Sequence, residues 1–403
     1  MLQGKTVLLG VSGSIAAYKT ASLASALKKK NCEVHVLMTA NASRFITPLT
    51  FETLTGQRCL VDTFDRQFEF NVAHVALAQR ADLILIAPAS ADILAKLAHG
   101  IADDMLTTTV LAARCPKLAA PTMNTAMYEN PITQDNLRRL GKAGFELIEP
   151  ASGRLACDDV GRGKMPEPEE LEEYILRRLA MPHDMEGQRV LVTAGPTQEA
   201  LDPVRFLSNH SSGRMGYALA RACAWRGADV TLVSGPSALT PPRFVEIVPV
   251  TSAAEMYDAV MERFPDCDFV FKAAAVADYT PAAPHDEKIK KRDDDLSVPL
   301  QRTRDILAAL GQQKRPDQFV CGFSMETQNL LANSRAKLEA KNVDMIVANS
   351  LRTAGAGFGA DTNIVTLLTA DGAEELPKMS KLEVAGAILD RAVKLRAAAK
   401  QAP

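Results

Sequence analysis

Residues 190–216 read VLVTAGPTQEALDPVRFLSNHSSGRMG, and this stretch decides the fold of the second half of the chain. It opens with β-branched apolar residues, breaks at Gly195-Pro196, and ends just before an alanine-rich helical pattern over residues 217–226. A strand, a loop and a helix N-terminus in this order can hold a phosphate. The first amide groups of a helix lack intrahelical acceptors, and the helix dipole favours an anion there. The stretch therefore predicts that a nucleotide-type fold begins near residue 190.

A second stretch of this kind opens the chain. Residues 6–20, TVLLGVSGSIAAYKT, show an apolar strand pattern, a Gly/Ser turn and the start of a helical pattern. Two such openings in 403 residues predict two domains of about two hundred residues each. We expect the domains at 1–189 and 190–403, with a linker at about 181–189. The Gly- and Pro-containing residues 151–168 predict a mobile loop over a site or a plain connection.

Strand and helix patterns alternate in both halves, which predicts an α/β fold with two Rossmann-like domains, each a mostly parallel sheet flanked by helices. In the first half we expect strands at 6–11, 33–38, 83–87, 117–120 and 146–148, and helices at 15–29, 91–97, 105–113 and 168–180. In the second half we expect strands at 189–193, 229–233, 245–250, 268–275, 319–323, 344–348 and 364–368, and helices at 214–226, 253–263, 304–310, 327–341 and 381–398. Ligands of such folds lie beyond the carboxyl ends of the strands.

The composition excludes several classes of protein. A net charge of −2 gives no reason to expect nucleic-acid or membrane binding. Seven scattered cysteines, with no Cys-x-x-Cys pair and no histidines at zinc spacing, predict free and mostly buried thiols in a reducing compartment. The sequence shows neither a signal peptide pattern nor an apolar run of membrane-spanning length. We therefore expect a cytoplasmic protein.

Three residues of the first half stand out, each with a simple structural alternative. His74 lies in an apolar amphipathic segment, where a lone histidine is more often a core or surface residue. Asn124 follows a strand directly, so it either faces the ligand crevice or caps a helix. Cys157 lies in the Gly-containing loop, a poor place for an inert buried thiol. Its neighbours Asp158 and Asp159 favour a protonated thiol that can give up a proton.

Three motifs together resemble the flavin-containing cysteine decarboxylase family: GVSGSIAAYK at 10–19, PTMNTAMY at 121–128 and ACDDVGRGKM at 156–165. The whole chain resembles the bifunctional bacterial coenzyme A biosynthesis family, in which phosphopantothenoylcysteine decarboxylase is fused to phosphopantothenate–cysteine ligase. The resemblance implies an FMN site, because flavin chemistry creates the electron sink that an ordinary carboxylate lacks. It gives His74 as base or flavin-positioning residue, Asn124 as the residue that binds the substrate carboxylate, and Cys157 as proton donor. The implied FMN positions are Gly10, Ser12, Gly13, Ser14, Thr39, Ser90, Ala91 and Asp92.

The second half also contains polar residues that have either a simple structural role or a role in a binding site. Ser211 and Ser212 can cap the helix that begins near Arg214. Asp278 ends an apolar strand pattern and can accept ribose hydroxyls, or it merely enters a loop. Two lysines four residues apart, Lys337 and Lys341, share one helix face, which is usually a solvated face. Lys288 lies in the charged, Gly-free stretch HDEKIKKRDDD at 285–295, which predicts a flexible flap.

For these residues the resemblance implies a ligase that activates 4'-phosphopantothenate with CTP as an acyl-cytidylate, which the amine of cysteine then attacks. Asn209 matches the residue tied to the acyl-cytidylate, and Lys288 the flap lysine associated with the cysteine half-reaction. Mg²⁺ is implied with the phosphates, and its ligands remain unknown at this point. The implied CTP positions are Lys272, Ala273, Ala274, Asp278, Lys288, Arg304, Asp305, Ile306, Leu307, Phe323, Lys337 and Lys341.

Two other functions stay open on the sequence alone. Two strand–Gly–helix openings also suggest a two-domain nicotinamide or flavin oxidoreductase, although the dinucleotide pattern G-x-G-x-x-G with a later acidic residue is missing. A non-catalytic flavin-binding regulatory protein is the other alternative, against which stands the joint presence of the matched catalytic residues. The resemblance further implies a homo-oligomer, with trimers of the flavin domain that assemble into a dodecamer and with ligase-domain dimers.

Overall fold

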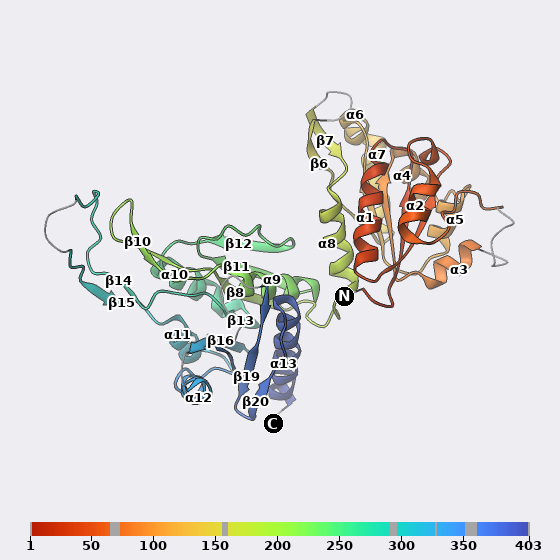
Figure 1. The fold of residues 1–403 in the computed structure, drawn as a ribbon. Coiled ribbons are helices and arrows are strands. Elements are labelled where there is room, and N and C mark those ends of the chain that lie inside the picture. The colour runs from red at the N-terminus through yellow and green to blue at the C-terminus, as the bar shows by residue number, and fades with distance from the viewer. Residues whose placement is uncertain are drawn as a thin grey trace. The chain divides into compact units, whose positions relative to one another are not determined.

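The structure, a computed structural model, describes residues 2–64, 73–154, 160–290, 296–326, 329–350 and 361–401. The chain divides into two compact units, Met1–Met181 and Pro182–Pro403, which are described separately below (Figure 1). The division lies at 181/182, whereas the sequence placed it at 189/190. Within the described ranges, no helix combines the length and the apolar character that a bilayer span requires.

The first unit is built on a five-stranded parallel sheet with the order β2-β1-β3-β4-β5. Its strands are β1 (Thr6–Val11), β2 (Glu33–Met38), β3 (Leu83–Ala89), β4 (Lys117–Pro121) and β5 (Phe145–Leu147). Every residue of β1 and β3 is buried, which explains why these strands have continuous apolar sequences rather than alternating ones. The five strands predicted for this half are confirmed, with ends shifted by at most two residues.

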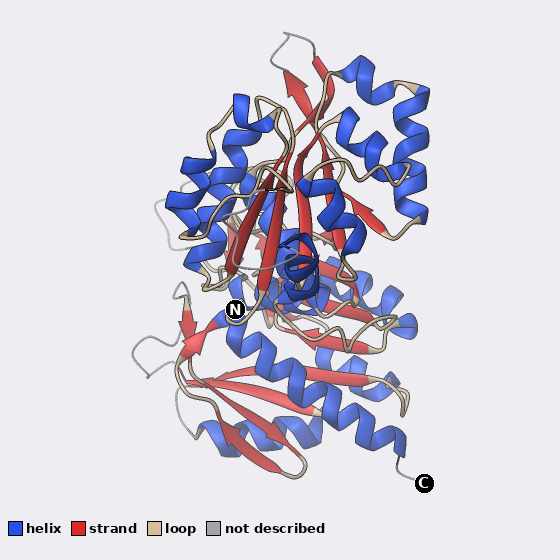
Figure 2. Cartoon of the chain, turned by 90° about the vertical axis from the view of Figure 1, so that its right-hand side faces the viewer, coloured by secondary structure: helices blue, strands red, loops and turns tan. Residues whose placement is uncertain are grey.

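Helices lie on both sides of this sheet (Figure 2). They are α1 (Ala17–Lys29), α2 (Pro48–Thr55), α3 (Ala73–Arg80), α4 (Ala91–Ala98), α5 (Met105–Ala112), α6 (Thr125–Glu129), α7 (Pro131–Lys142) and α8 (Pro168–Leu179), with a 3₁₀ turn at Ala42–Arg44. Local sequence sets several starts: the Ser90 hydroxyl accepts a hydrogen bond from the Ile93 amide, and Asp104 and Thr107 form a capping box. The apolar sides of α4, α5 and α7 pack into one core with β1, β3 and β4.

Part of the stretch 151–168 is regular, contrary to the predicted loop. Strands β6 (Ala151–Arg154) and β7 (Val160–Lys164) form an antiparallel hairpin. The Met123 amide donates to the Gly163 carbonyl at 3.0 Å, and a Cβ on Gly163 would lie 2.2 Å from the Met123 carbonyl oxygen. This stretch shows no strand period because its glycines serve this close approach instead of forming an apolar face. Residues 155–159, which include Cys157, lie outside the described residues.

The second unit is built on an eight-stranded sheet with the order β12-β11-β8-β13-β16-β17-β19-β20, in which the β17–β19 and β19–β20 pairs are antiparallel and the other pairs parallel. The strands are β8 (Arg189–Ala194), β11 (Asp229–Ser234), β12 (Val245–Pro249), β13 (Phe269–Lys272), β16 (Phe319–Glu326), β17 (Met345–Ser350), β19 (Val365–Thr369) and β20 (Gly372–Glu375). The helices are α9 (Arg214–Trp225), α10 (Ala253–Arg263), α11 (Ile306–Gln313), α12 (Leu330–Ala340) and α13 (Lys381–Gln401), with a 3₁₀ turn at Phe264–Asp266.

Three small antiparallel pairs complete the second unit. They are β9 (Gln198–Ala200) with β10 (Phe206–Ser208), β14 (Tyr279–Pro281) with β15 (Leu300–Arg302), and β18 (Thr362–Asn363) with β21 (Met379–Ser380). The sequence predicted none of these pairs. It also predicted a strand over 268–275, but β13 ends at Lys272. There the chain turns away, and the Ala274 amide donates to the Thr193 hydroxyl at 3.1 Å.

The expected linker is part of the second unit. Arg226, only 2% exposed, donates to both carboxylate oxygens of Asp184 and, at 2.7 Å, to Asp390 of α13. Met185 is fully buried, and its amide donates to the Arg226 carbonyl at 3.1 Å. Residues 182–188 are therefore anchored to α9 and α13.

The described cysteines behave as core residues. All six are free thiols, and all are buried except the half-buried Cys115. Burial raises the pKa of Cys32 to about 11 and that of Cys59 to about 12. The prediction of free, mostly buried thiols is confirmed for this part of the chain.

Candidate active sites

The carboxyl edge of the first sheet collects the expected flavin residues. Because the order is β2-β1-β3, the chain leaves β1 in one direction and returns on its other side at β3, and ligands of such sheets bind at this switch point. The loops that follow β1, β2 and β3 carry Ser12–Ser14, Thr39 and Ser90–Asp92. The structure therefore brings these three groups to one edge.

Ser12 connects two of these loops. Its buried hydroxyl donates to the Pro88 carbonyl at 2.8 Å and accepts from the Ser90 amide at 2.9 Å. Next to it, a Cβ on Gly13 would lie 2.8 Å from Cβ of Asn41 in the loop after β2. Ser12 therefore positions the loops around the edge, and Gly13 lets two of them approach closely.

The remaining features of this edge suit an anionic group that approaches α1. This helix has no side-chain cap and no acidic residue in its first turn, so its first amides face the edge without a competing carboxylate. Ser14 and Thr39 accept hydrogen bonds from the nearby amides of Ala16 and Ala42. Small and hydroxyl-bearing residues thus surround a helix N-terminus, which fits the phosphate of a flavin nucleotide.

Three expected flavin residues make further contacts in the structure. Gly10 lies inside β1, where a Cβ would meet Cδ1 of Leu106 at 2.6 Å, so its small size serves packing against α5. The carboxylate of Asp92 lies 3.8 Å from the Lys96 ammonium and is largely exposed. The side chain of Ser90 caps α4, while its amide bonds to Ser12.

Asn124 caps α6, as its simple alternative predicted. Its side chain accepts from the Ala126 amide at 2.8 Å. The hairpin of β6 and β7 lies against the same loop, because a Cβ on Gly161 would contact the Thr125 side chain at 2.6 Å. The strand that follows the segment with Cys157 therefore packs beside Asn124.

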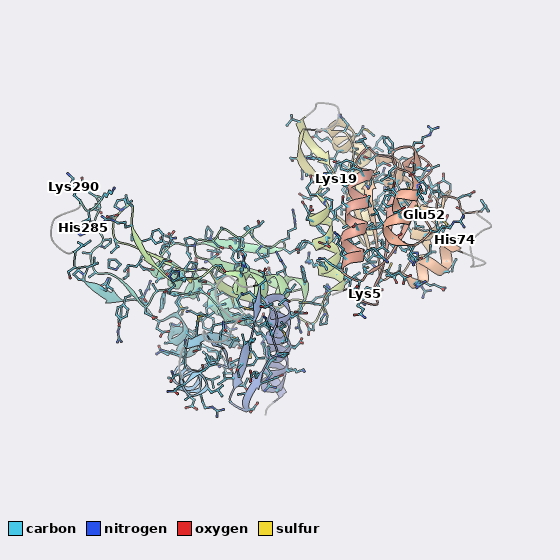
Figure 3. The ribbon with its side chains drawn as sticks, in the orientation of Figure 1. Lys5, Lys19, Glu52, His74, His285 and Lys290 are labelled. Atoms are coloured by element: carbon cyan, nitrogen blue, oxygen red, sulfur yellow. The ribbon has the colours of Figure 1, made fainter. Side chains whose placement is uncertain are left out.

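His74 lies elsewhere in this unit. It is the second residue of α3 and is half-buried. Figures 1 and 3 show α3 and His74 well separated from α6 and the β6–β7 hairpin. A single chain does not bring His74 and Asn124 together.

In the second unit, two cavities meet at the switch point between β8 and β13. One, of about 240 Å³, is lined by residues that include the loop before α9, the loop after β13 and the end of β16. The other, of about 400 Å³, lies between the loop after β13 and the N-terminus of α11. They share a wall made of Lys272, Val276, Asp278 and Lys337. All expected CTP positions line one cavity or the other except Lys288 and Lys341.

Glycines shape the entrance to α9. Gly213 has φ +78°, a left-handed conformation, and directly precedes the helix. A Cβ on Gly216 would lie 2.9 Å from the Thr193 carbonyl oxygen of β8. These glycines let the N-terminus of α9 approach the end of β8, where its amides face the smaller cavity.

Charged groups concentrate on the shared wall. Lys272 donates to the Ala274 carbonyl at 3.2 Å, and burial, together with the charge of Lys337, lowers the pKa of Lys272 to about 8. Burial alone would raise the pKa of Asp305. The hydrogen bond from Lys341 at 2.7 Å helps hold that pKa below its usual value. Lys341 thus pairs with Asp305 instead of lining a cavity.

Asn209 and Arg304 both contact protein groups at the cavity walls. The Asn209 amide donates to the carbonyls of Ala275 and Val276 at 3.0 and 3.2 Å, so it fixes the loop after β13. The Arg304 guanidinium lies over the Tyr257 ring at 3.9 Å and bonds to Asp258 at 2.6 Å. Its guanidinium therefore contacts α10, while Arg304 also lines the larger cavity.

Lys288 is exposed in the segment between β14 and β15. This segment carries His285 and Lys290, which are labelled in Figure 3, and it lies away from α12 and β16 (Figure 1). Its neighbour Ile289 is held on both sides: its amide donates to Asp202 at 3.1 Å, and its carbonyl accepts from Arg205 at 2.8 Å. Sequence reasoning missed Asp202 and Arg205. The Asp-Pro turn signal in LDPVR was the available clue.

Among the described residues, no group of three or more His, Cys, Asp or Glu side chains could hold a metal ion. The side chains of the two cavities include more cations than carboxylates. A divalent ion at this site would therefore be bound with the phosphates of a ligand.

Comparisons with known proteins agree with this division of the chain. Residues 1–180 match a flavoprotein family model, and residues 185–395 match the DNA/pantothenate metabolism flavoprotein C-terminal domain. The coenzyme A biosynthesis bifunctional protein CoaBC of Bacillus subtilis (strain 168) is 48% identical over 395 residues, which cover 96% of this chain and 97% of that protein.

Two solved structures correspond to one half each. A crystal structure of the C-terminal domain of coenzyme A biosynthesis bifunctional protein CoaBC is 44% identical and covers 53% of this chain and 97% of its own, with a TM-score of 0.46. A PPC decarboxylase mutant complexed with pantothenoylaminoethenethiol is 34% identical and covers 42% of this chain and 96% of its own, with a TM-score of 0.39.

Proposed function

The chain belongs to the family of bifunctional coenzyme A biosynthesis proteins, and from this premise we propose which residues carry each of its two reactions. It is a phosphopantothenoylcysteine decarboxylase in its first unit and a phosphopantothenate–cysteine ligase in its second. The ligase reaction comes first, although its unit is second in the chain, because its product is the substrate of the decarboxylase. A nicotinamide oxidoreductase or a non-catalytic regulatory protein is not favoured.

The first unit is a flavoprotein, and we infer that its cofactor is FMN. The amides at the start of α1, with Ser14 and Thr39, would hold the phosphate, and Ser12 would keep the surrounding loops in place. Bound flavin supplies the two-electron oxidation that makes an electron sink for the departing CO₂. Asn124 would hold the substrate carboxylate, and Cys157 would donate a proton.

The second unit would use CTP to activate 4'-phosphopantothenate. A carboxylate is a poor electrophile because oxide is a poor leaving group, and a cytidylyl ester supplies a better one. The two cavities and their shared cationic wall support this assignment, because two substrates that must react with each other can bind there side by side. Asp278 would accept the ribose hydroxyls, and Lys272 and Lys337 would neutralise phosphate charge together with Mg²⁺.

The amine of cysteine would then displace CMP. Lys288 would assist this second half-reaction from the segment between β14 and β15. Asn209 would act by fixing the loop after β13, beside the acyl-cytidylate.

We also propose a homo-oligomer, with flavin-unit trimers that assemble into a dodecamer through ligase-unit dimers. The separation of His74 from Asn124 supports shared decarboxylase sites, because a neighbouring copy can supply the missing histidine. Native mass spectrometry tests this proposal, and a stable monomer with full decarboxylase activity would contradict it.

The first experiment is the visible absorption spectrum of the purified protein, followed by acid release of its chromophore. Oxidised-flavin bands with recovery of FMN support the cofactor assignment. A colourless protein that takes up no added FMN contradicts it. Pyrophosphate release from CTP that depends on 4'-phosphopantothenate tests the ligase assignment separately, and equal activity with any other nucleoside triphosphate would contradict the choice of CTP.

A further inference from the structure

A carboxylate of the flavin unit joins the helix that carries His74 to the edge strand of the sheet. Glu33 is the first residue of β2, and its Oε2 atom accepts a hydrogen bond from the Arg80 guanidinium at 2.8 Å. Arg80 is the last residue of α3, and His74 is the second. The contact therefore joins two elements whose residues are 47 positions apart, away from the residues assigned to either reaction.

The strand and a buried histidine hold Glu33 in place. Its amide donates to the Lys5 carbonyl at 2.9 Å, and its Oε1 atom lies 2.9 Å from Nε2 of His35. Burial alone would raise the pKa of Glu33, but the hydrogen bond with His35 and the charge of Arg80 hold that pKa below its usual value. The carboxylate is therefore ionised near neutral pH and presents one oxygen to each partner.

The other contacts of α3 locate the helix but fix its direction less well. Leu77 and Ala78 are buried in the core that α3 shares with α5. Just after the helix, the Asp82 amide donates to the Thr6 carbonyl at 2.9 Å, and the Asp82 carboxylate accepts from the Thr6 amide at 2.8 Å. Apolar packing is non-directional, whereas a hydrogen bond is directional. The contact with Glu33 thus limits how far α3 can tilt about its C-terminal end.

A small tilt of α3 moves His74 by a distance that matters for catalysis. Arg80 lies six residues after His74, which is roughly 9 Å along the axis at about 1.5 Å per residue. A tilt of roughly 6° about the Arg80 end therefore displaces His74 by about 1 Å. A displacement of that size can cost on the order of 100-fold in rate. The side chains of Glu33 and Arg80 are 27% and 50% exposed, so their pairing contributes little to stability and acts mainly on orientation.

We propose that Glu33 is a positioning residue for decarboxylation, which acts on His74 through Arg80 and α3. This inference rests on the role proposed for His74 in the decarboxylase and deepens it. Glu33 takes no part in the chemistry itself. Its carboxylate limits the tilt of α3, so that the imidazole meets the bound substrate in a reactive orientation.

The test begins with the turnover of Glu33→Gln in the full chain. Glutamine has the same size, but only one of its two terminal atoms accepts a hydrogen bond, so it cannot serve His35 and Arg80 as the carboxylate does. We expect kcat for phosphopantothenoylcysteine, per bound flavin, to fall at least fivefold with less than a twofold change in KM. Arg80→Lys should retain more activity than Arg80→Gln. Unchanged kcat in Glu33→Gln overturns the proposal, and so do equal rates in the two Arg80 variants.

Glu146→Gln is the matched control. Glu146 lies in β5 of the same unit, its side chain is 20% exposed, and it accepts a hydrogen bond from Arg178 at 2.7 Å. Its partner lies on α8 rather than on α3. Loss of this ion pair should therefore leave kcat per bound flavin unchanged. An equal fall of kcat in Glu146→Gln would indicate a general defect and would overturn the assignment.

Co-expression of two differently tagged variants separates positioning from a general defect of the subunit. We expect mixed oligomers of Glu33→Gln and Asn124→Ala to exceed the average activity of the two parents. The Glu33→Gln copies can then offer an intact Asn124 to the well-placed histidine of a neighbour. Mixed oligomers of Glu33→Gln and His74→Asn should show only the average. The opposite pattern overturns the proposal.

Mixed oligomers of His74→Asn and Asn124→Ala are the positive control for shared sites. Without a gain in this control the sites are not shared, and the kcat comparison alone decides. If the wild-type protein does not decarboxylate phosphopantothenoylcysteine, or if His74→Asn is fully active, the proposed function of this site fails. Hydrogen exchange then tests the anchor alone. Faster exchange of the α3 amides in Glu33→Gln but not in Glu146→Gln supports it, and no difference overturns it.

Discussion

At the residue scale, Lys272 is an ionisable side chain whose burial disfavours the charged form. Its pKa of about 8 implies that, in the absence of phosphate, the ammonium loses its proton as the pH rises through about 8. Only the protonated form attracts phosphate. We therefore predict that kcat/KM for CTP in pyrophosphate release falls as the pH rises through about 8. Omission of cysteine keeps its own ionisation out of the measurement.

Lys272→Arg is the diagnostic variant for this prediction. Arginine stays protonated throughout this range, so the fall in kcat/KM should disappear even if the absolute rate is lower. A fall with the same midpoint in Lys272→Arg would assign the titration to another group. Decarboxylation of added phosphopantothenoylcysteine, measured over the same pH range, should not change between the two proteins.

Sequence reasoning reached part of the ligase site at this scale. Asp278 and Lys337 stood out by their positions at a strand end and on a helix, and Lys272 was implied by the resemblance; the structure places all three on the shared wall. Asp202 was missed because its partner Ile289 is 87 positions away and contributes only backbone atoms. No local pattern encodes this relation.

At the scale of elements, the hairpin of β6 and β7 depends on Gly163. Its φ of +135° favours glycine, and a Cβ there would clash with the Met123 carbonyl oxygen unless one segment moved. We predict that Gly163→Ala displaces the hairpin from the Asn124 loop and lowers decarboxylase activity at least tenfold. Flavin absorbance and ligase activity should remain.

Gly141→Ala is the control for this prediction. Gly141 lies in α7 with open space around it, so alanine should stabilise the unit slightly through helix propensity, by up to about 1 kcal/mol. Full decarboxylase activity in Gly163→Ala would show that the hairpin does not position the catalytic groups.

The segment that carries Lys288 depends on the turn of the β9–β10 hairpin. Asp202 accepts from the Ile289 amide, and the Arg205 hydrogen bond to Asp202 helps hold the pKa of that carboxylate well below its usual range. We predict that Asp202→Ala slows the cysteine-dependent step at least tenfold but leaves pyrophosphate release without cysteine nearly unchanged. Faster hydrogen exchange at Ile289 should accompany the loss.

Comparison with Lys288→Gln separates two causes. If Lys288→Gln leaves the cysteine step intact, the role assigned to Lys288 is wrong. If only Lys288→Gln has an effect, the hairpin does not position the lysine. A loss of pyrophosphate release in Asp202→Ala would indicate a general structural defect.

Most long elements could be predicted, and most short ones could not. Buried parallel strands such as β1 show continuous apolar runs, which are visible without tertiary information. The β9–β10 and β14–β15 pairs have three residues per strand, too few to establish a period. The charged stretch between β14 and β15 was therefore expected as a flap without its flanking strands; residues 291–295 of it lie outside the described residues.

At the scale of the whole molecule, residues 182–188 belong energetically with the ligase unit. Asp184→Ala leaves the buried Arg226 with one carboxylate, that of Asp390, instead of two. We predict that this change destabilises the ligase unit by about 1–3 kcal/mol, measured by urea unfolding. The flavin unit should unfold as in the wild type.

The neighbouring Glu186→Ala provides the comparison. Its side chain is 69% exposed, so the free energy of unfolding should change by no more than about 0.5 kcal/mol. Equal effects of the two substitutions would argue that the segment is a passive connection. The sequence marked this stretch as a linker because its composition is polar, while its anchor, Arg226, lies 42 positions from Asp184.

The buried thiols can report separately on the unfolding of each unit of the enzyme. Cys32 and Cys59 lie in the flavin unit, and Cys223, Cys267 and Cys321 in the ligase unit. Native burial keeps these thiols protonated and shielded, so an alkylating reagent reaches them only when their own core opens. Peptide mass spectrometry after a brief alkylation during heating would therefore show, within a single sample, at which temperature each unit unfolds. No engineered label is needed, because each unit already contains buried cysteines.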